Sequence, residues 1–327
     1  MLAKALTALI TVAIGIGGAM LVYYLLNKIA ELLPERWEDR IKPYLYILPA
    51  FLAISVYLIY PAVLTVINSF KDRFSRNWVG TQNYSDLLSS PAFRDTLLNT
   101  LLWILIVPAV TVILGLLVAT LADRLEPSGE KLAKTIIFLP MAISMVGAAT
   151  IWRFVYYAAP AGQSQIGLQN ALLGVFGKDP VAWLQQSQFH LNSLLLMVVL
   201  LWSQIGFSMV LLSAAVKGVP VDTLEAARID GAGERQIFFR VVVPQIKGTI
   251  ITVFITVTIG VMKIFDIVYV MTNGNFNTNV LGNEFYNQFS TNFNSGAAAA
   301  IVVMLMLAVI PIMWYQVRHF KAEEANA

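Results

Sequence analysis

Long apolar runs dominate the hydrophobic pattern of this chain. Seven of them are long enough to cross about 30 Å of bilayer hydrocarbon as α-helices. They are 5–26, 44–66, 97–121, 135–156, 193–215, 248–271 and 297–317. The second, third, fifth and seventh runs contain no Asp, Glu, Lys or Arg. Because every run is too long for a buried strand, the pattern predicts an all-α integral membrane protein with about seven transmembrane helices.

The first run could also be a secretory signal. Its 22 residues exceed the usual apolar core of about 7–15 residues, and no A-x-A-like cleavage site follows. We therefore interpret it as a retained helix. Prolines occur inside four of the later runs, and we interpret them as helix kinks that a membrane bundle tolerates. They are Pro49, Pro61, Pro108, Pro140 and Pro311.

Composition supports the membrane assignment. Apolar residues make up 58% of the chain, charged residues only 13%, and the mean hydropathy is +0.71. A chain of 327 residues cannot hide that much apolar surface in a soluble core. The net charge of +3 is small and scattered, so no nucleic-acid partner is expected. With no cysteine and only His190 and His319 as imidazoles, no metal site and no catalytic set is predicted.

The connections between the runs differ in basic residues, which indicates their orientation. One set of connections, 27–43, 122–134, 216–247 and 318–327, holds fourteen Lys and Arg, and the other set holds six. Basic residues favour the cytoplasmic side. We therefore expect the N-terminus outside and the C-terminus in the cytoplasm, although four basic residues in 67–96 weaken the bias locally.

The connection 216–247 is patterned as two short helices. Asp222 and Glu225 place acidic groups near the positive N-terminal end of the first helix. Gly231 can end that helix in a left-handed conformation, and a second helix over 234–243 is predicted to follow. By periodicity alone, the connection is most typical of an amphipathic linker on the inner membrane surface.

The same connection carries a motif. Residues 225–232 read E-A-A-R-I-D-G-A, and Pro244, which is expected to stop the second helix, lies thirteen residues after Gly231. This resembles the EAA loop of ABC importer permeases: E-A-A, three residues, G, nine residues, then I-x-L-P. Val241 and Val243 stand in place of the Ile and Leu.

The resemblance implies that this loop is a coupling helix that docks in a groove of a cytoplasmic ATPase subunit. Small alanines would let the partner approach closely, and the carboxylates of Glu225 and Asp230 could accept hydrogen bonds from it. The coupling positions carried over from the motif are Glu225, Ala226, Ala227, Asp230, Gly231, Ala232 and Pro244.

Further matches resemble carbohydrate importer permeases of the maltose-permease type. Residues 80–84 fit G-x-x-N-Y, and Asn99-Thr100 opens the third span as in that group. Residues 139–144 and 151–153 fit its fourth span, and 265–272 fit the end of its sixth span. The family's G-G-x-P turn is replaced here by N-G-N-F at 273–276. That departure looks most like permeases for α-glucosides and glucosylglycerol.

The resemblance covers 44–317 and implies a permease core of six helices preceded by one N-terminal helix. The expected domains are 1–43 (N-terminal helix and cytoplasmic linker), 44–317 (importer transmembrane domain, with its EAA loop at 216–247) and 318–327 (cytoplasmic tail). The implied partners are a second permease subunit, an ABC ATPase dimer and an extracytoplasmic solute-binding protein, in a bacterial-type inner membrane. The sequence has no G-x-x-x-x-G-K-[ST] phosphate loop, so ATP and Mg are expected on the ATPase, with no cofactor in this chain.

A sugar pathway needs planar polar groups and aromatic faces inside the bundle. Trp202 and Gln204 lie near the middle of the fifth run, and an interhelical hydrogen bond is the structural alternative for the glutamine. Lys263 and Asp266 are three apart in the sixth run, where they could neutralise each other on one helix face. Tyr269 follows on that face and could instead belong to an interfacial aromatic belt.

Two other functions stay open at this point. A stand-alone secondary transporter would be driven by H⁺ or Na⁺ through Asp266 and Lys263. A membrane scaffold or receptor would have an inner loop that binds no ATPase. The EAA-like loop disfavours both.

Overall fold

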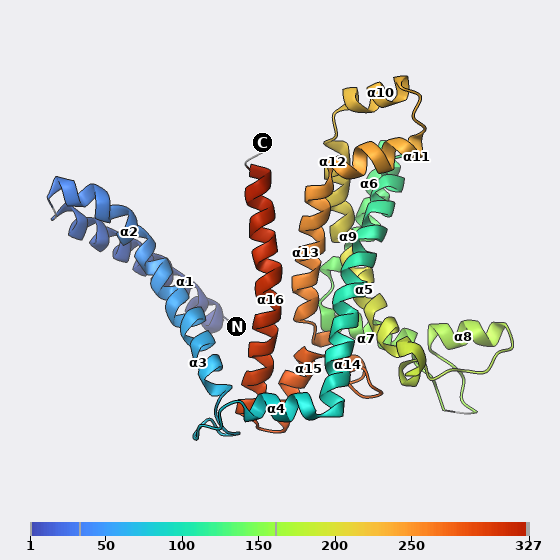
Figure 1. The fold of residues 1–327 in the computed structure, drawn as a ribbon, viewed down its shortest axis with the longest axis horizontal. Helices are drawn as coiled ribbons and strands as arrows, with labels where there is room; N and C mark the ends of the chain where they lie inside the picture. Colours follow the sequence, from blue (N-terminus) through green and yellow to red (C-terminus); the bar gives the residue numbers. More distant parts are fainter. Residues whose placement is uncertain (1, 33, 161, 325–327) are drawn as a thin grey trace. The chain divides into compact units, whose positions relative to one another are not determined.

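The computed structural model describes residues 2–32, 34–160 and 162–324 (Figure 1). Contacts divide the chain into two compact units, Met1–Ile67 and Asn68–Ala327. Within the described residues, the secondary structure is helical apart from a single antiparallel bridge between Lys71 and Trp78. We describe each unit by itself.

The first unit is built from α1 (Leu2–Glu31), α2 (Glu35–Ile54), the π-helical segment η1 (Ser55–Ile59) and α3 (Tyr60–Asn68). The hydroxyl of Tyr46 on α2 donates to Asn27 Oδ1 on α1 over 2.8 Å. The rings of Tyr23 and Tyr46 also stack, with centroids 6.1 Å apart. The predicted linker 27–43 is therefore largely helical, and α1 and α2 form a helical hairpin.

The second unit contains the remaining helices. They are α4 (Gln82–Ser89), α5 (Pro91–Ala122), α6 (Pro127–Phe138), η2 (Leu139–Ala142), α7 (Met145–Val155), α8 (Leu168–Val175), η3 (Trp183–Gln185), η4 (Gln188–His190), α9 (Leu191–Lys217), α10 (Val221–Ile229), α11 (Glu234–Ile237), η5 (Phe238–Val242), α12 (Val243–Gln245), α13 (Lys247–Met262), α14 (Asp266–Met271), α15 (Leu281–Tyr286), η6 (Asn287–Thr291) and α16 (Ser295–Glu324). In Figure 1, α10 and α11 lie beyond the ends of α9 and α13, at the opposite end of this unit from α4 and α15.

The predicted membrane fold is confirmed. In the described part of the chain, five helices are long and apolar enough to cross a bilayer. They are Leu6–Glu31, Arg40–Asn68, Pro91–Ala122, Gln188–Lys217 and Ser295–Arg318. Two bent helix pairs supply up to two further spans, which brings the total to the seven predicted apolar runs.

The fourth and sixth spans are not the straight helices that the apolar runs predict. The fourth bends by 102° between Pro127–Ala142 and Met145–Val155. Pro140 lies in the tight turn η2, and the hydroxyl of Ser144 accepts a bond from the amide of Gly147 to start α7 afresh. The sixth bends by 68° between Glu234–Gln245 and Lys247–Met262. It also breaks at its other end, where α13 ends at Met262 and α14 begins only at Asp266.

The core of the second unit lies between α5, α9 and α13. Trp103, Leu196, Met209 and Val253 are fully or almost fully buried there. The helices α5 and α9 approach closely at Gly115, where an added Cβ would lie 2.3 Å from Ser208 Oγ. Small residues at such crossings let membrane helices make close van der Waals contact without a hydrophobic drive from water.

Candidate functional site

The EAA-like motif forms α10 and the turn after it. Gly231 adopts a left-handed conformation with φ of +80°, and the amide of Ala232 bonds to the carbonyl of Ala227 over 3.0 Å. The predicted glycine-terminated helix is therefore present. Leu224 and Ala227 face a small apolar core whose buried members include Val219 and Ile237. That core holds the loop against the ends of the neighbouring helices.

The opposite face of α10 is exposed. Glu225, Ala226 and Asp230 are all exposed, whereas Ala227 is half-buried. Val221 and Ile229 on the same helix are 63% and 86% exposed. Both are large apolar side chains in a position that water should disfavour.

Val221, Glu225 and Ile229 are spaced four apart, so they form one stripe along the outward face of α10. We call these three residues the α10 stripe. Sequence reasoning had singled out only Glu225 of the three. The four-residue spacing of the apolar pair was the signal that could have found the other two.

The second helix of the loop is longer than predicted. α11, η5 and α12 run on continuously from Glu234 to Gln245, so Pro244 lies within the last turn and does not stop the helix. The π-helical segment η5 precedes the proline, and such wider turns accommodate a residue that cannot donate a backbone hydrogen bond. Pro244 itself is exposed.

An ion pair joins the two helices of the loop. Arg228 Nε on α10 donates to Glu234 Oε1 on α11 over 2.9 Å. The hydrogen bond to this carboxylate raises the pKa of the Arg228 guanidinium. The pair helps to fix the angle across the glycine turn.

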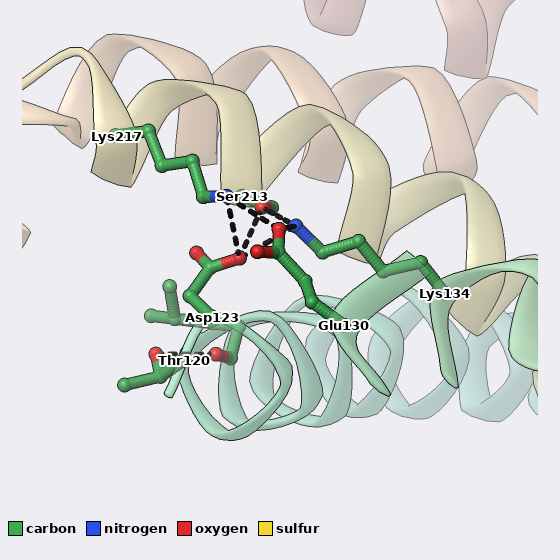
Figure 2. A network of polar contacts seen from close by, with 7 residues as sticks. Thr120, Asp123, Glu130, Lys134, Ser213 and Lys217 are labelled. Atoms are coloured by element: carbon green, nitrogen blue, oxygen red, sulfur yellow. Dashed lines mark hydrogen bonds and ion pairs between the residues drawn. The ribbon is translucent and has the colours of Figure 1, made fainter. Parts of the chain in front are cut away.

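A second polar cluster lies at the same end of the unit (Figure 2). Lys134 Nζ on α6 contacts Asp123 Oδ1 over 2.5 Å, Glu130 Oε1 over 2.6 Å, and the hydroxyl of Ser213. Lys217 Nζ also contacts Glu130 and lies 3.7 Å from Asp123 Oδ1. We call these five residues the lysine–carboxylate cluster.

The cluster ties together three helices. Asp123 caps the end of α5, Glu130 and Lys134 belong to α6, and Ser213 and Lys217 lie in the last turns of α9. Since α9 leads into α10 through a short turn at 218–220, the cluster fixes the helix that carries the loop against both of its neighbours.

A pocket of about 320 Å³ brings together three of the predicted pathway residues. Gln204 from α9 and Lys263 and Asp266 from the break after α13 line it, beside Met145 and Phe207. These residues come from segments far apart in the sequence, and the two broken spans supply much of the wall.

The predicted helix-face pair of Lys263 and Asp266 is wrong. Lys263 ends α13 and Asp266 begins α14, while Phe265 between them has φ of −142° and ψ of −57°, which is not helical. No ion pair joins the two residues in the part of the chain that the structure describes. The structural alternative for Gln204, an interhelical hydrogen bond, is not present among the described residues.

The other two predicted pathway residues lie outside this lining. Trp202 packs edge-to-face on Trp152 of α7, with ring centroids 5.8 Å apart. Tyr269 lies 5.0 Å from both Phe265 and Tyr286, centroid to centroid, and reaches the pocket only through Phe265. Within the described ranges, no group of three His, Cys, Asp or Glu is placed to hold a metal ion.

Comparison with known proteins shows what this bundle is. The model of the family described as "binding-protein-dependent transport system inner membrane component" matches residues 93–321. The chain belongs to this family. It is therefore a permease subunit of an ABC importer and an inner membrane component.

Two relatives are similar over most of their length. The permease is 46% identical to the α-glucoside transport system permease protein AglF of Rhizobium meliloti, over 89% of this chain and 86% of that protein. It is 45% identical to the osmoprotective compounds uptake permease protein GgtC of Synechocystis sp., over 86% of this chain and 99% of that protein.

The fold agrees with that of a solved importer. A chain of a bacterial ABC transporter involved in the import of the acidic polysaccharide alginate matches with a TM-score of 0.72 at 21% identity. The match covers 88% of the permease and 99% of that chain. At this identity the likeness concerns the fold alone.

Proposed function

We propose that this permease subunit carries a carbohydrate inward, of the α-glucoside, disaccharide or glucosylglycerol-like class. The proposal is supported by the two relatives, which are named for α-glucoside transport and for uptake of osmoprotective compounds. The pocket at the two broken spans offers an amide, a cation and a carboxylate beside apolar walls. This mixture suits hydroxyl groups together with the C–H faces of a sugar.

ATP-driven movement reaches the permease through α10. The observation that carries this step is the α10 stripe, which exposes two large apolar side chains around Glu225 on the outer face of a firmly anchored loop. An exposed apolar patch rimmed by polar residues marks a site that binds a protein or a membrane surface, and the EAA-like motif favours a protein here. The partner is an ATPase subunit, and residues 225–231 dock in a groove on its surface.

The remaining parts of the assembly follow from this role. A second permease subunit completes the pathway, an ATPase dimer binds ATP and Mg, and this chain holds no cofactor. A solute-binding protein delivers the sugar, in keeping with the binding-protein-dependent family. The N-terminus lies outside and the C-terminus in the cytoplasm, so that 216–247 faces the ATPase.

Transport proceeds by alternating access. When the ATPase dimer closes on ATP, it displaces α10. The small apolar core around Val219 and Ile237 and the lysine–carboxylate cluster transmit this displacement to α9, α5 and α6. The pocket opens to the docked binding protein and receives the sugar. Hydrolysis then returns the helices to the inward-open state.

Glu225→Lys in the assembled complex tests the coupling role. The variant reverses the charge at the centre of the α10 stripe, so we expect normal membrane insertion but loss of the ATPase stimulation that the loaded binding protein causes. Glu126→Lys is the matched control, because it makes the same charge change on an exposed residue of the α5–α6 connection.

Two outcomes would overturn the proposal. Unchanged stimulation in Glu225→Lys would remove α10 from the coupling path. Sugar uptake into liposomes by the purified permease alone, without nucleotide, would favour the ion-coupled secondary transporter.

A further inference from the structure

An apolar groove runs between the last turns of α5 and the second helix of the loop. Ile113, Leu117 and Leu121 form one wall at intervals of four residues, and Phe239 on η5 forms the other. All four side chains are at least half exposed. The groove encloses about 610 Å³.

Two arginines lie at the end of this groove. Arg124 follows the end of α5, and Arg235 lies on α11. Neither guanidinium has an ion-pair partner among the described residues. The one carboxylate in the lining, that of Glu234, is already neutralised by Arg228 over 2.9 Å. The mouth of the groove is therefore positively charged.

The groove combines the two properties of a lipid site. Its long apolar wall continues a predicted membrane span, where an acyl chain is the ordinary neighbour. Its charged mouth lies at the end of that span, at the depth of lipid headgroups. Basic pockets between transmembrane helices on the cytoplasmic side bind anionic headgroups.

We propose that one anionic phospholipid of the inner leaflet occupies this groove, with an acyl chain along 113–121 and its phosphate between Arg124 and Arg235. Charge complementarity selects this occupant over a neutral lipid, which would leave both arginines without a counter-ion. The proposal rests on the proposed cytoplasmic placement of 216–247 but not on the coupling role of α10.

The site would give the coupling loop a lipid contact. Arg124 belongs to the α5 end and Arg235 to the loop, so one phosphate bridges them much as the lysine–carboxylate cluster bridges α5, α6 and α9. The bound lipid therefore joins the loop to the helix end, where among the described residues Glu234 attracts Arg124 but no ion pair joins the two.

Lipid retention by the purified full complex tests the proposal. Native mass spectrometry would compare phosphatidylglycerol with phosphatidylcholine of the same acyl chains. The double variant Arg124→Gln/Arg235→Gln should bind phosphatidylglycerol roughly 30-fold more weakly, because two basic contacts to the headgroup are lost. Arg124→Lys/Arg235→Lys should keep most of the binding, and Arg240→Gln, on the same helix but outside the groove, should keep all of it.

A second measurement locates the acyl chain. Phosphatidylglycerol with a photoactivatable acyl group should label peptides containing 113–121 or Phe239, and excess glycerol phosphate should not compete. Equal retention of the two lipids by the unaltered complex would overturn the proposal, and so would undiminished retention of phosphatidylglycerol by the double variant. So would a cross-link showing that a helix of the second permease subunit fills the groove, or labelling that free phosphate abolishes. Each of these outcomes is independent of the Glu225→Lys result.

Discussion

Charged groups are arranged differently in two regions of the permease. One is the end of the second unit that carries α10 and α11, which we call the loop end, and the other is the pocket lined by Gln204, Lys263 and Asp266. At the loop end, Lys134 has three oxygen partners, and Arg228 and Glu234 neutralise each other. In the pocket, Lys263 and Asp266 face the same space without an ion pair between described residues. The backbone leaves the helix between Lys263 and Asp266, so the three-residue spacing does not bring them together on one helix face.

This difference fits the two proposed roles: the loop end transmits movement from the ATPase, and the pocket binds the solute. A region that passes on movement has to behave as one body, and multiple ion pairs between helix ends remove the freedom of each end. A region that binds a hydroxylated solute has to keep donors and acceptors available, because groups already satisfied by the protein gain little from a ligand. The two broken spans keep the pocket groups apart, whereas the helix ends draw the cluster together.

Backbone packing differs between α9 and α13. At Gly206 on α9, an added Cβ would lie 2.6 Å from the carbonyl oxygen of Ile137 and 2.7 Å from Phe138 Cα at the end of α6. At Gly260 on α13, beside the pocket, an added Cβ would meet nothing within 4 Å. Gly206 is required by the close approach of α6 and α9, whereas Gly260 borders open space.

The largest expected effect is that of Gly206→Leu. The new side chain meets backbone atoms that cannot rotate away, so we expect a loss of about 3 kcal/mol, the upper part of the usual overpacking range. Thermal unfolding of the assembled complex in detergent measures it. Gly260→Ala is the control and should be neutral or stabilising by up to about 1 kcal/mol. Equal effects at the two positions would contradict the close approach of α6 and α9.

A smaller effect is expected from breaking the lysine–carboxylate cluster. Lys134→Met removes the less exposed of the two cations that Asp123 and Glu130 share, so the melting temperature should fall by more than in Lys217→Met. The reason is burial: the Lys134 side chain is 21% exposed and that of Lys217 is 51% exposed. Salt screens exposed pairs more strongly.

Lys134→Arg keeps the charge and should recover most of that loss. The cluster would be only a surface feature if the two methionine variants melted at the same temperature, or if high salt removed the difference between them.

The smallest effect tests the pocket. Lys263→Met and Asp266→Asn should each raise the KM for sugar uptake, and their free-energy effects should add within about 0.5 kcal/mol, because the two groups are not paired. The double-mutant cycle uses uptake by the reconstituted complex. A coupling energy well above that value would show that Lys263 and Asp266 form an ion pair after all. That result would contradict the contrast with the loop end.

Much of the fold could be predicted from local pattern. A run of 20 or more apolar residues can satisfy its backbone in lipid only as a helix, so all seven spans were expected. The glycine after the first loop helix was predicted in its left-handed conformation for the same local reason. The pathway residues were harder: Gln204, Lys263 and Asp266 share a pocket, while Trp202 and Tyr269 lie outside its lining. Their distribution depends on segments about sixty residues apart in the chain.

By itself, then, the sequence determined the spans, the motif loop and the family, because hydrophobic length and a spaced motif are properties of contiguous residues. Only the tertiary structure decided where the spans break. At 263–265 the chain leaves the helix where an added Cβ on Gly282 would lie 2.4 Å from the carbonyl oxygen of Ile264, so the start of α15 approaches the freed backbone. Breaks of this kind, like the pairing of Asp123 with Lys134, depend on which helices pack against each other. The hydropathy pattern along the chain does not specify those contacts.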